Sequence, residues 1–492
     1  MNDFIKVMNN TTETENGALT NISTFDSCLD WFFHGAALRG QDTNRIVDLF
    51  SKAFNENPQA ALRILFYIRD CRGGQGEREI FRICLKWLAD NATDWLAKHL
   101  SLIAEYGRYD DYLCLLDTKL AQHTTIFLIG RLMDDKTAIG TNNLSNLSLC
   151  AKWMPSLTSS KESKRLTKRF ISLVRDLYII DFNEEKYRKL ISELRKAIKI
   201  VEHNLTERNY VDINYSKIPS YASLKYRKAF ARNDNIRYSE YIEQVKAGKV
   251  KINAKTLYPY DLVKKYLQGN YIIDTVDDTV EEQWKALPDY VPNINGLVVY
   301  DTSGSMTGLP VQVSTSLALY IAERNKSEVW KNYCIPFSSK AEWKEVKGTT
   351  LLEKIKSINT GDCSNTNLQS VFDLILQRAT AFNVKSEDMP TVLLIITDME
   401  FDSAYVAEKW SKTNFQAIEE KYKQAGYKRP NLVWWNVNSR NTQTPITKDN
   451  NGNILLSGCS ASMLTVALSG EFDPIEAMNR VINQERYQQI SW

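Results

Sequence analysis

The spacing of apolar residues divides the chain into two parts. Between residue 24 and about residue 200, apolar positions recur every three or four residues, as at Ile46, Leu49, Phe50 and Ala53. This spacing is typical of helices that bury one face. The pattern predicts antiparallel helix pairs stacked as an α-solenoid of the HEAT-like kind, although no fixed repeat period is evident.

From residue 297 onward, short uninterrupted apolar runs alternate with helical patterns. Such runs are typical of strands that are covered on both faces. We expect strands at residues 297–300, 329–337, 391–397 and 432–437. We expect helices at residues 311–324, 366–381, 404–425 and 474–486. The alternation predicts a doubly wound α/β sheet, so the fold class of the whole chain is α plus α/β.

Polar stretches set the expected boundaries of these parts. Residues 1–22 are polar and predict a mobile tail, which precedes the helical domain at residues 23–275. Residues 276–292 carry several carboxylates and predict an acidic connector. The α/β domain is expected to occupy residues 293–492.

An Asp-x-Ser-x-Ser turn directly follows the first predicted strand. Its Asp301, Ser303 and Ser305 can direct three oxygens toward one point at the carboxyl end of the sheet. Mg²⁺ prefers such oxygen ligands, but three are too few for an octahedral ion. More oxygens are available at Thr366, in a polar loop before a helix, and at Asp398, directly after a later buried strand.

This arrangement resembles the metal-ion-dependent adhesion site (MIDAS) of von Willebrand factor A (vWA) domains. The resemblance implies that Asp301, Ser303, Ser305 and Thr366 hold Mg²⁺ or Mn²⁺, and that Asp398 helps directly or through water. It also implies an open coordination position that a partner's Asp or Glu fills. The alternative is an ordinary Asx-turn in a Rossmann-like domain.

Two further carboxylates follow Asp398, at a place where many vWA domains have Gly. Glu400 and Asp402 could alter the outer shell of the ion, but we expect them to be solvated loop residues.

Composition excludes several classes of protein. The 492 residues are 43% hydrophobic and 25% charged, as in globular proteins. No apolar run is long enough for a transmembrane helix, and the first residues do not form a signal peptide. The eight cysteines and four histidines are scattered, so we expect no disulfide or zinc framework and a reducing cytoplasm.

Charge is distributed unevenly along the chain. Residues 161–270 carry 25 Lys and Arg against 13 Asp and Glu, a balance of +12. The net charge of the whole chain is +3, so the remainder has a balance of −9. This asymmetry indicates an anionic partner for the middle region.

The basic side chains of that region are candidates for binding nucleic acid. They are Lys164, Arg165, Lys168, Arg169, Lys189, Lys196, Lys225, Arg227, Lys228 and Arg232. Six tyrosines are interleaved, at positions 210, 215, 221, 226, 238 and 241. Cations and aromatic rings are what single-stranded RNA requires. Alternatively, the cations solvate long helices and the tyrosines fill the core.

A Gly-rich stretch at residues 72–78 lies between predicted helices. Such a turn can present backbone N–H groups to a phosphate. It lacks the Gly-Lys-Ser/Thr ending of a nucleotide P-loop. A tight turn between helices, with Glu77 in the first helical turn, is the favoured interpretation.

Together with residues 152–155, 187–197, 213–220 and 259–266, this stretch resembles a family of TROVE-like proteins of undefined function. That family is similar in layout to the Ro autoantigen, in which a ring of helical repeats is closed by a vWA domain. The resemblance covers about residues 25–490. It implies a ribonucleoprotein scaffold that binds structured or single-stranded RNA, and contact between the first helices and residues 293–492.

Three functions therefore stand as hypotheses. The first is a non-enzymatic RNA-binding scaffold with a metal-dependent ligand site. The second is a protein-interaction or particle component, in which the metal binds an acidic residue of a partner. The third is a metal-dependent enzyme acting on RNA or nucleotides, which is disfavoured because no base residue lies at a fixed spacing from the ion loop.

Overall fold

A computed structural model describes residues 10–15, 17, 19–177, 180–198, 200–269, 271–291, 295–337, 341–359, 368–400, 412–470 and 472–492, except the side chains of Leu19 and of residues 412–417. The contacts divide the chain into two compact units. The sheet unit comprises Met1–Ile64, Gly73–Gln75 and Lys251–Ser491. The helical unit comprises Leu65–Arg72, Gly76–Val250 and Trp492.

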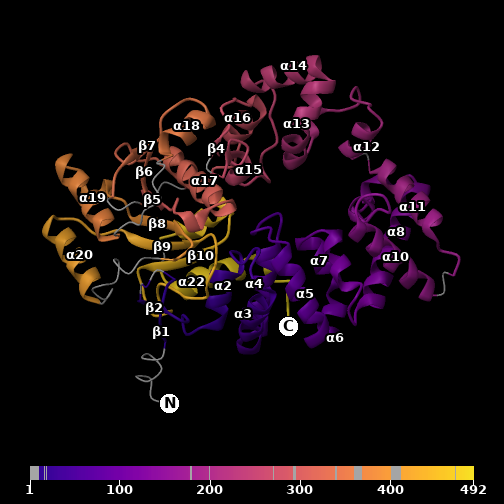
Figure 1. Ribbon diagram of the computed structural model, residues 1–492, viewed down its shortest axis with the longest axis horizontal. Coiled ribbons are helices and arrows are strands. Elements are labelled where there is room, and N and C mark those ends of the chain that lie inside the picture. Colours follow the sequence, from indigo (N-terminus) through magenta and orange to yellow (C-terminus); the bar gives the residue numbers. More distant parts are fainter. Residues whose placement is uncertain are drawn as a thin grey trace. The chain divides into compact units, whose positions relative to one another are not determined.

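The sheet unit is built on six strands in the order β10-β9-β8-β5-β6-β7 (Figure 1). The strands are β5 (Gly296–Tyr300), β6 (Tyr333–Pro336), β7 (Lys344–Glu345), β8 (Val392–Thr397), β9 (Asn431–Asn436) and β10 (Asn453–Ser457). All neighbours are parallel except β7, which pairs antiparallel with β6 at one edge. Every residue of β5 and β8 is buried, which explains the uninterrupted apolar runs in the sequence.

Helices cover this sheet. The helices that follow β5 along the chain are α17 (Leu309–Arg324), α18 (Leu351–Ile358), α19 (Leu368–Ala381), α20 (Lys412–Gln424), α21 (Leu464–Ala467) and α22 (Pro474–Ile482). α17 packs against β5, β6 and β8, and α22 packs against β10. The alternation of strands and helices confirms the predicted α/β class of this region. The edge strands β7 and β10 had not been predicted.

The first helices belong to the same unit. They are α2 (Ser27–Gly35), α3 (Thr43–Glu56) and the start of α4 (Pro58–Arg69). α2 lies beside β10 (Figure 1), and the Ser457 hydroxyl donates to the Phe32 carbonyl over 2.8 Å. The expected contact between the first helices and residues 293–492 is therefore present. Its physical reason is that α2 is buried from Cys28 to Gly35, so it needs cover on all sides.

Part of the segment predicted as a mobile tail is an antiparallel hairpin. β1 (Thr11–Glu13) pairs with β2 (Leu19–Asn21). Asn21 and Thr444 then exchange backbone hydrogen bonds of 3.1 and 2.8 Å. The prediction of a mobile tail is thus wrong for these strands, because they pair with each other and Asn21 pairs with a segment far along the chain.

The predicted acidic connector contains a buried helix, α16 (Asp278–Lys285). Glu281 accepts hydrogen bonds from the Tyr266 hydroxyl (2.8 Å) and from the Leu351 N–H (2.6 Å). Trp284 is 2% exposed, and its indole donates to Glu323 over 2.8 Å. Glu281 is therefore a hydrogen-bond acceptor inside the unit, and this part of the predicted connector is a packed helix. α15 (Pro259–Val263) and the short pair β3 (Leu267–Gln268) and β4 (Tyr271–Ile272) precede α16.

The helical unit confirms the helical periodicity of the first part of the chain. Besides the end of α4, its helices are α5 (Glu79–Asn91), α6 (Thr93–Lys98), α7 (Leu100–Tyr106), α8 (Ala121–Gly140), α9 (Cys150–Trp153), α10 (Lys161–Asp176), α11 (Glu184–Ala197), α12 (Val201–Thr206), α13 (Ser220–Asn233) and α14 (Asn235–Lys246). Within the described part of the chain, no helix is long and apolar enough to cross a membrane.

Candidate functional site

The predicted ion set begins at the carboxyl end of β5, which Asp301 follows directly. β5 and β8 are parallel neighbours with Tyr300 opposite Ile396, so Asp301 and Asp398 leave the sheet at the same edge. The Asp301 N–H donates to the Ile396 carbonyl over 3.0 Å, which fixes the start of the turn. Two of the predicted ligands therefore stand at adjacent strand ends, where ligands bind in α/β sheets.

The carboxylate of Asp301 is buried and hydrogen-bonded. Its Oδ1 accepts from the Ser303 N–H (2.8 Å), and its Oδ2 accepts from the Thr397 hydroxyl (2.7 Å). Burial raises the pKa of Asp301, and these hydrogen bonds oppose the rise. The Ser303 and Ser305 hydroxyls lie 3.0 Å apart. Asp301, Ser303 and Ser305 thus form one linked group of oxygens, as the turn predicted.

Asp398 is the least satisfied member of the set. It is 2% exposed, and its Oδ2 has no hydrogen-bond partner among the described residues. Burial and the nearby charges of Asp301 and Glu400 raise the pKa of Asp398 to about 7, although hydrogen bonds from Ser305 and the Glu400 N–H oppose the rise. A positive charge near this oxygen would favour the ionised form.

The residue after Asp398 has an unusual backbone. Met399 has a φ of +66°, a left-handed conformation that is costly for a residue with a Cβ. Its N–H donates to the Thr397 hydroxyl over 3.2 Å. The Met399 side chain is 3% exposed, so it packs inside the sheet unit.

The expectation that Glu400 is solvated is wrong. Glu400 is 6% exposed, and its carboxylate accepts from Asn441 (2.8 Å), from Gln443 (3.0 Å) and from the Glu15 N–H (2.9 Å). The reason is that the loop after β9 and the N-terminal segment cover it. These partners are distant in the sequence, so the local pattern did not reveal them.

A cation that the sequence analysis missed lies beside Asp398. Arg440 Nη1 is 4.0 Å from Asp398 Oδ2, and Arg440 Nη2 is 2.6 Å from Glu15 Oε2. Arg440 follows β9, the next parallel strand after β8. The rule that ligands gather at carboxyl strand ends would have directed attention to this loop.

Two residues named in the sequence analysis, Thr366 and Asp402, lie outside the described residues. Within the described ranges, no group of three or more His, Cys, Asp or Glu side chains is arranged to hold a metal ion. The candidate site instead pairs two carboxylates, from Asp301 and Asp398, with hydroxyl groups.

The candidate RNA-binding cations lie on α10, α11 and α13 in the helical unit. Four of them are ion-paired: Arg165 with Asp117 (2.9 Å) and Glu162 (2.8 Å), Lys168 with Glu184 (3.7 Å), Arg169 with Asp117 (3.3 Å) and Lys189 with Glu185 (2.7 Å). Lys225 lies 4.8 Å from the Tyr226 ring, and the half-buried Arg227 donates to the Leu224 carbonyl over 2.8 Å. Lys164, Lys196, Lys228 and Arg232 are exposed, and no ion pair with a described residue involves them.

Half of the interleaved tyrosines belong to the core. Tyr215, Tyr238 and Tyr241 are buried and pack with one another, and the first two also pack with Phe230, at ring-centroid distances of 5.0 to 6.2 Å. These rings are not available to stack on bases. Tyr221 is 50% exposed, so it remains a candidate for stacking.

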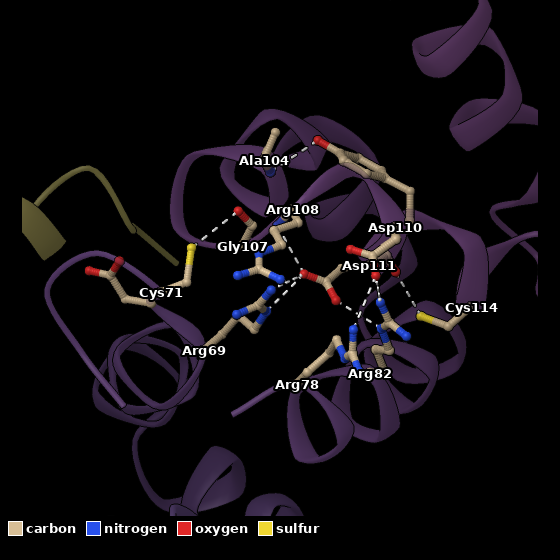
Figure 2. Close-up of polar contacts among 12 residues, drawn as sticks. Arg69, Cys71, Arg78, Arg82, Ala104, Gly107, Arg108, Asp110, Asp111 and Cys114 are labelled. Carbon is tan, nitrogen blue, oxygen red and sulfur yellow. Dashed lines mark hydrogen bonds and ion pairs between the residues drawn. The ribbon is translucent and has the colours of Figure 1, made fainter. Parts of the chain in front are cut away.

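Residues on both sides of the Gly-rich stretch take part in a network of arginines around Asp111 (Figure 2). Asp111 is fully buried; its Oδ2 is 2.7 Å from Arg69 Nη2, and its Oδ1 accepts from Arg82 Nε over 2.8 Å. The Gly76 and Glu77 N–H groups donate to backbone carbonyls 3.1 and 2.8 Å away. These two N–H groups are therefore hydrogen-bonded within the turn and are not available to bind a phosphate. Glu77 is buried and precedes α5, so its expected place in the first helical turn is wrong.

Gln75, in the same stretch, is packed inside the sheet unit. Its Oε1 accepts from the Ser460 N–H over 3.2 Å. Gly458 has a φ of +97°, and a Cβ there would lie 2.4 Å from Gln75 Oε1 and 2.9 Å from the Ala36 Cβ. This close approach requires glycine at position 458 and gives Gln75 a structural role.

Comparisons with known proteins match the two parts of the chain separately. The model of a family described as domain of unknown function DUF2828 matches residues 14–107 and 128–294. A second model, domain of unknown function DUF7788, matches residues 295–490. The chain is also 29% identical over 515 residues to uncharacterized protein L728 of Acanthamoeba polyphaga mimivirus, a match that covers 96% of this chain and 88% of that protein. Because the first model matches more than half of its residues, the chain belongs to the DUF2828 family.

Proposed function

We propose that the protein is a non-enzymatic binding protein whose α/β domain is a vWA domain with a Mg²⁺ or Mn²⁺ site at Asp301, Ser303, Ser305 and Asp398. The observation that carries this proposal is the buried Asp398 Oδ2, which lacks a hydrogen bond to any described residue and lies near the charge of Asp301. Leaving a buried carboxylate oxygen unpaired is costly. A divalent cation would remove that cost.

The residues at the site fit such an ion. Hard divalent cations bind carboxylate and hydroxyl oxygens, and the turn supplies both kinds on elements fixed by the sheet. The Thr397 hydroxyl donates a hydrogen bond to Asp301 and so fixes the orientation of its carboxylate. When bound, the ion would present a positive charge to an acidic group of a partner, and the resemblance of the turn to a MIDAS supports this role.

Thermal unfolding in MgCl₂ or MnCl₂ tests the metal site. At about 100 times its dissociation constant, an ion that binds only the folded state stabilises it by about 2.7 kcal/mol. We expect D301A to lose this stabilisation while its circular dichroism spectrum is unchanged. The matched control is D449A, which removes an exposed carboxylate in the same unit. An equal metal-induced shift in D301A and wild type would refute the site.

We further propose that the helical unit is a TROVE-like, HEAT-like scaffold that binds RNA. Residues 161–250 of this unit carry 21 Lys and Arg against 12 Asp and Glu, a balance of +9 that supports the proposal. Exposed cations without an ion pair to any described residue support it further. Phosphate contacts by such cations release counterions, so affinity falls steeply with salt.

A comparison of two quadruple variants with equal charge change tests RNA binding. The first replaces Lys164, Lys196, Lys228 and Arg232 by Gln, and the second replaces the ion-paired Arg165, Lys168, Arg169 and Lys189 by Gln. If all four cations of the first set contact phosphates, the slope of log affinity against log salt becomes shallower by about 3 for single-stranded RNA. The second variant should change the slope less, because its cations are already partly neutralised. Equal losses in both variants, or no binding by wild type at low salt, would exclude this RNA surface.

A particle or protein-interaction component is the second candidate function. It is favoured by the ion pairs of four candidate cations and by the burial of Tyr215, Tyr238 and Tyr241, both of which reduce the surface available to RNA. In that function, the metal site binds an acidic residue of another protein.

A further inference from the structure

The loop after β9 is held rigidly at the edge of the candidate metal site. The Val437 N–H donates to the Thr397 carbonyl over 3.1 Å, at the end of β8. The Ser439 N–H donates to the Ala37 carbonyl over 2.9 Å, and Arg45 donates to the carbonyl of Arg440. The backbone of Arg440 is thus fixed from two sides, so the position of its guanidinium is a property of the fold.

Arg440 reaches two acidic groups from this fixed position. One is Asp398, whose Oδ2 is 4.0 Å from Nη1, and the other is Glu15, whose Oε2 is 2.6 Å from Nη2. The side chains of Arg440 and Glu15 are 35% and 43% exposed, so the pair lies where a partner can reach it. One guanidinium nitrogen of Arg440 therefore binds the exposed Glu15, while the other lies 4.0 Å from the buried Asp398 without a hydrogen bond to it.

The contacts of Glu15 define a place for a carboxylate. Its Oε2 is bound by Arg440, and its Oε1 accepts from Asn441 Nδ2 over 3.3 Å. Each oxygen of the planar group has its own donor, and both donors come from the same loop. The Glu15 N–H also donates to Glu400 over 2.9 Å, which anchors the N-terminal segment beside the site.

We propose that Glu15 is an internal occupant of a binding site for a partner's carboxylate, and that Arg440 and Asn441 recognise that carboxylate beside the metal. This inference rests on the proposed metal site and names a second recognition element of that site. A partner's Asp or Glu displaces Glu15 and engages the guanidinium and amide of the loop. The N-terminal segment thereby competes with the partner and lowers its affinity.

The geometry favours a carboxylate over an RNA phosphate. The two donors each face one oxygen of a planar group, and the occupant seen in the structure is itself a carboxylate. Glu400 lies beside the site with both oxygens bound. Its negative charge opposes a phosphodiester, which brings further negative charges along its chain.

The test measures binding of a fluorescent, terminally blocked peptide with a single Glu among Ala and Ser residues. Anisotropy is recorded in MnCl₂, and the same peptide with Gln in place of Glu is the ligand control. E15Q removes the competing charge and keeps the Glu15 N–H contact to Glu400. We expect E15Q to bind the Glu peptide roughly two- to fivefold more tightly than wild type, since exposed ion pairs contribute about that much. R440A should bind it more weakly than wild type.

Matched controls separate local from general charge effects. E13Q makes the same charge change on the exposed Glu13 of β1, and K331A removes an exposed cation elsewhere in the unit. Both should bind as wild type does. A second readout is hydrogen exchange of residues 10–15, which R440A and excess Glu peptide should both accelerate because each breaks the contact that holds Glu15.

The possible outcomes distinguish failure of the carboxylate site from failure of the metal site. If wild type and E15Q bind the Glu peptide equally in a Mn²⁺-dependent way, the metal site stands and the role of Glu15 is refuted. If Mn²⁺ stabilises the protein but no variant binds the peptide, the carboxylate site is refuted alone. If a short RNA instead accelerates exchange of residues 10–15, the occupant is a phosphate and the inference is overturned. If neither Mn²⁺ nor peptide has any effect, both proposals fail.

Discussion

Asp111 in the helical unit and Asp398 in the sheet unit are both buried, but their surroundings differ. Asp111 has Arg69 at 2.7 Å, Arg82 at 2.8 Å and the Arg108 N–H at 3.0 Å, so both oxygens are bound. Asp398 has one oxygen without a hydrogen bond to any described residue, and its nearest described cation is 4.0 Å away. Both oxygens of Asp111 are already bound within the fold, whereas the unpaired oxygen of Asp398 is the one that the proposed metal ion would use.

The largest loss of stability is expected from a substitution at Asp111. D111N keeps the shape of the side chain but removes the charge that compensates the buried Arg69, which is 2% exposed. Removing one partner of a buried ion pair costs about 3 to 5 kcal/mol. We expect D111N to lose about that much free energy of unfolding, measured by urea denaturation of the helical signal.

The control for that measurement is D110N, next to Asp111. Asp110 is 16% exposed and contacts Arg78 and Arg82 at 3.4 and 2.8 Å, so its loss should cost less. A loss below about 1 kcal/mol in D111N would show that the arginine network is not structural, because that is the range of exposed pairs.

Removing the charge of Asp398 should instead increase the free energy of unfolding at pH 7. Burial and neighbouring carboxylates raise its pKa to about 7, above the ordinary value of 3.8. Between these two pH values the folded state therefore binds more protons than the unfolded chain, so wild-type stability falls as pH rises through this window. D398N cannot ionise, and we expect it to be more stable than wild type at pH 7 by about 2 to 4 kcal/mol in metal-free buffer.

The measurement is the free energy of unfolding of both proteins from pH 4 to pH 8, with chelator and with saturating MnCl₂. The advantage of D398N should vanish near pH 4, where wild-type Asp398 is protonated. It should also shrink in MnCl₂, which stabilises only the wild type. A constant difference at all pH values would mean that Asp398 does not titrate in this window.

The sequence predicted the strands that carry Asp301 and Asp398, but it did not predict which remote residues cover the site. The positions of Asp301 and Asp398 follow from two buried apolar runs, because parallel strands bring their carboxyl ends to one edge. The burial of Glu400 could not be predicted, since its partners Asn441 and Glu15 are distant along the chain. Local patterns report periodicity, but they do not report which remote loop covers a residue.

The same limit applies to the connector and to the Gly-rich stretch. Glu281 lies in the run predicted as an acidic connector, yet it is buried, and the Tyr266 hydroxyl and the Leu351 N–H donate to its carboxylate. Gln75 lies in the stretch predicted as a tight turn between helices, yet the close approach of Gly458 makes it part of a packed contact with a distant segment. In each case a distant backbone group supplies the hydrogen bond that makes burial of a polar side chain favourable.

The smallest expected effect concerns the turn that presents Asp398. Met399 has a φ of +66°, and the matched pair M399A and M399G both remove its buried side chain. They differ in backbone tolerance, because only Gly adopts this conformation without a steric penalty. At most positions Gly is less stable than Ala, but here we expect M399G to be more stable than M399A by about 1 kcal/mol. Urea denaturation of the two variants measures the difference, and metal titration shows whether the turn still presents Asp398. If M399A were the more stable, the strain would be absent; if M399G lost metal-induced stabilisation, the packed Met399 side chain would be what positions the carboxylate.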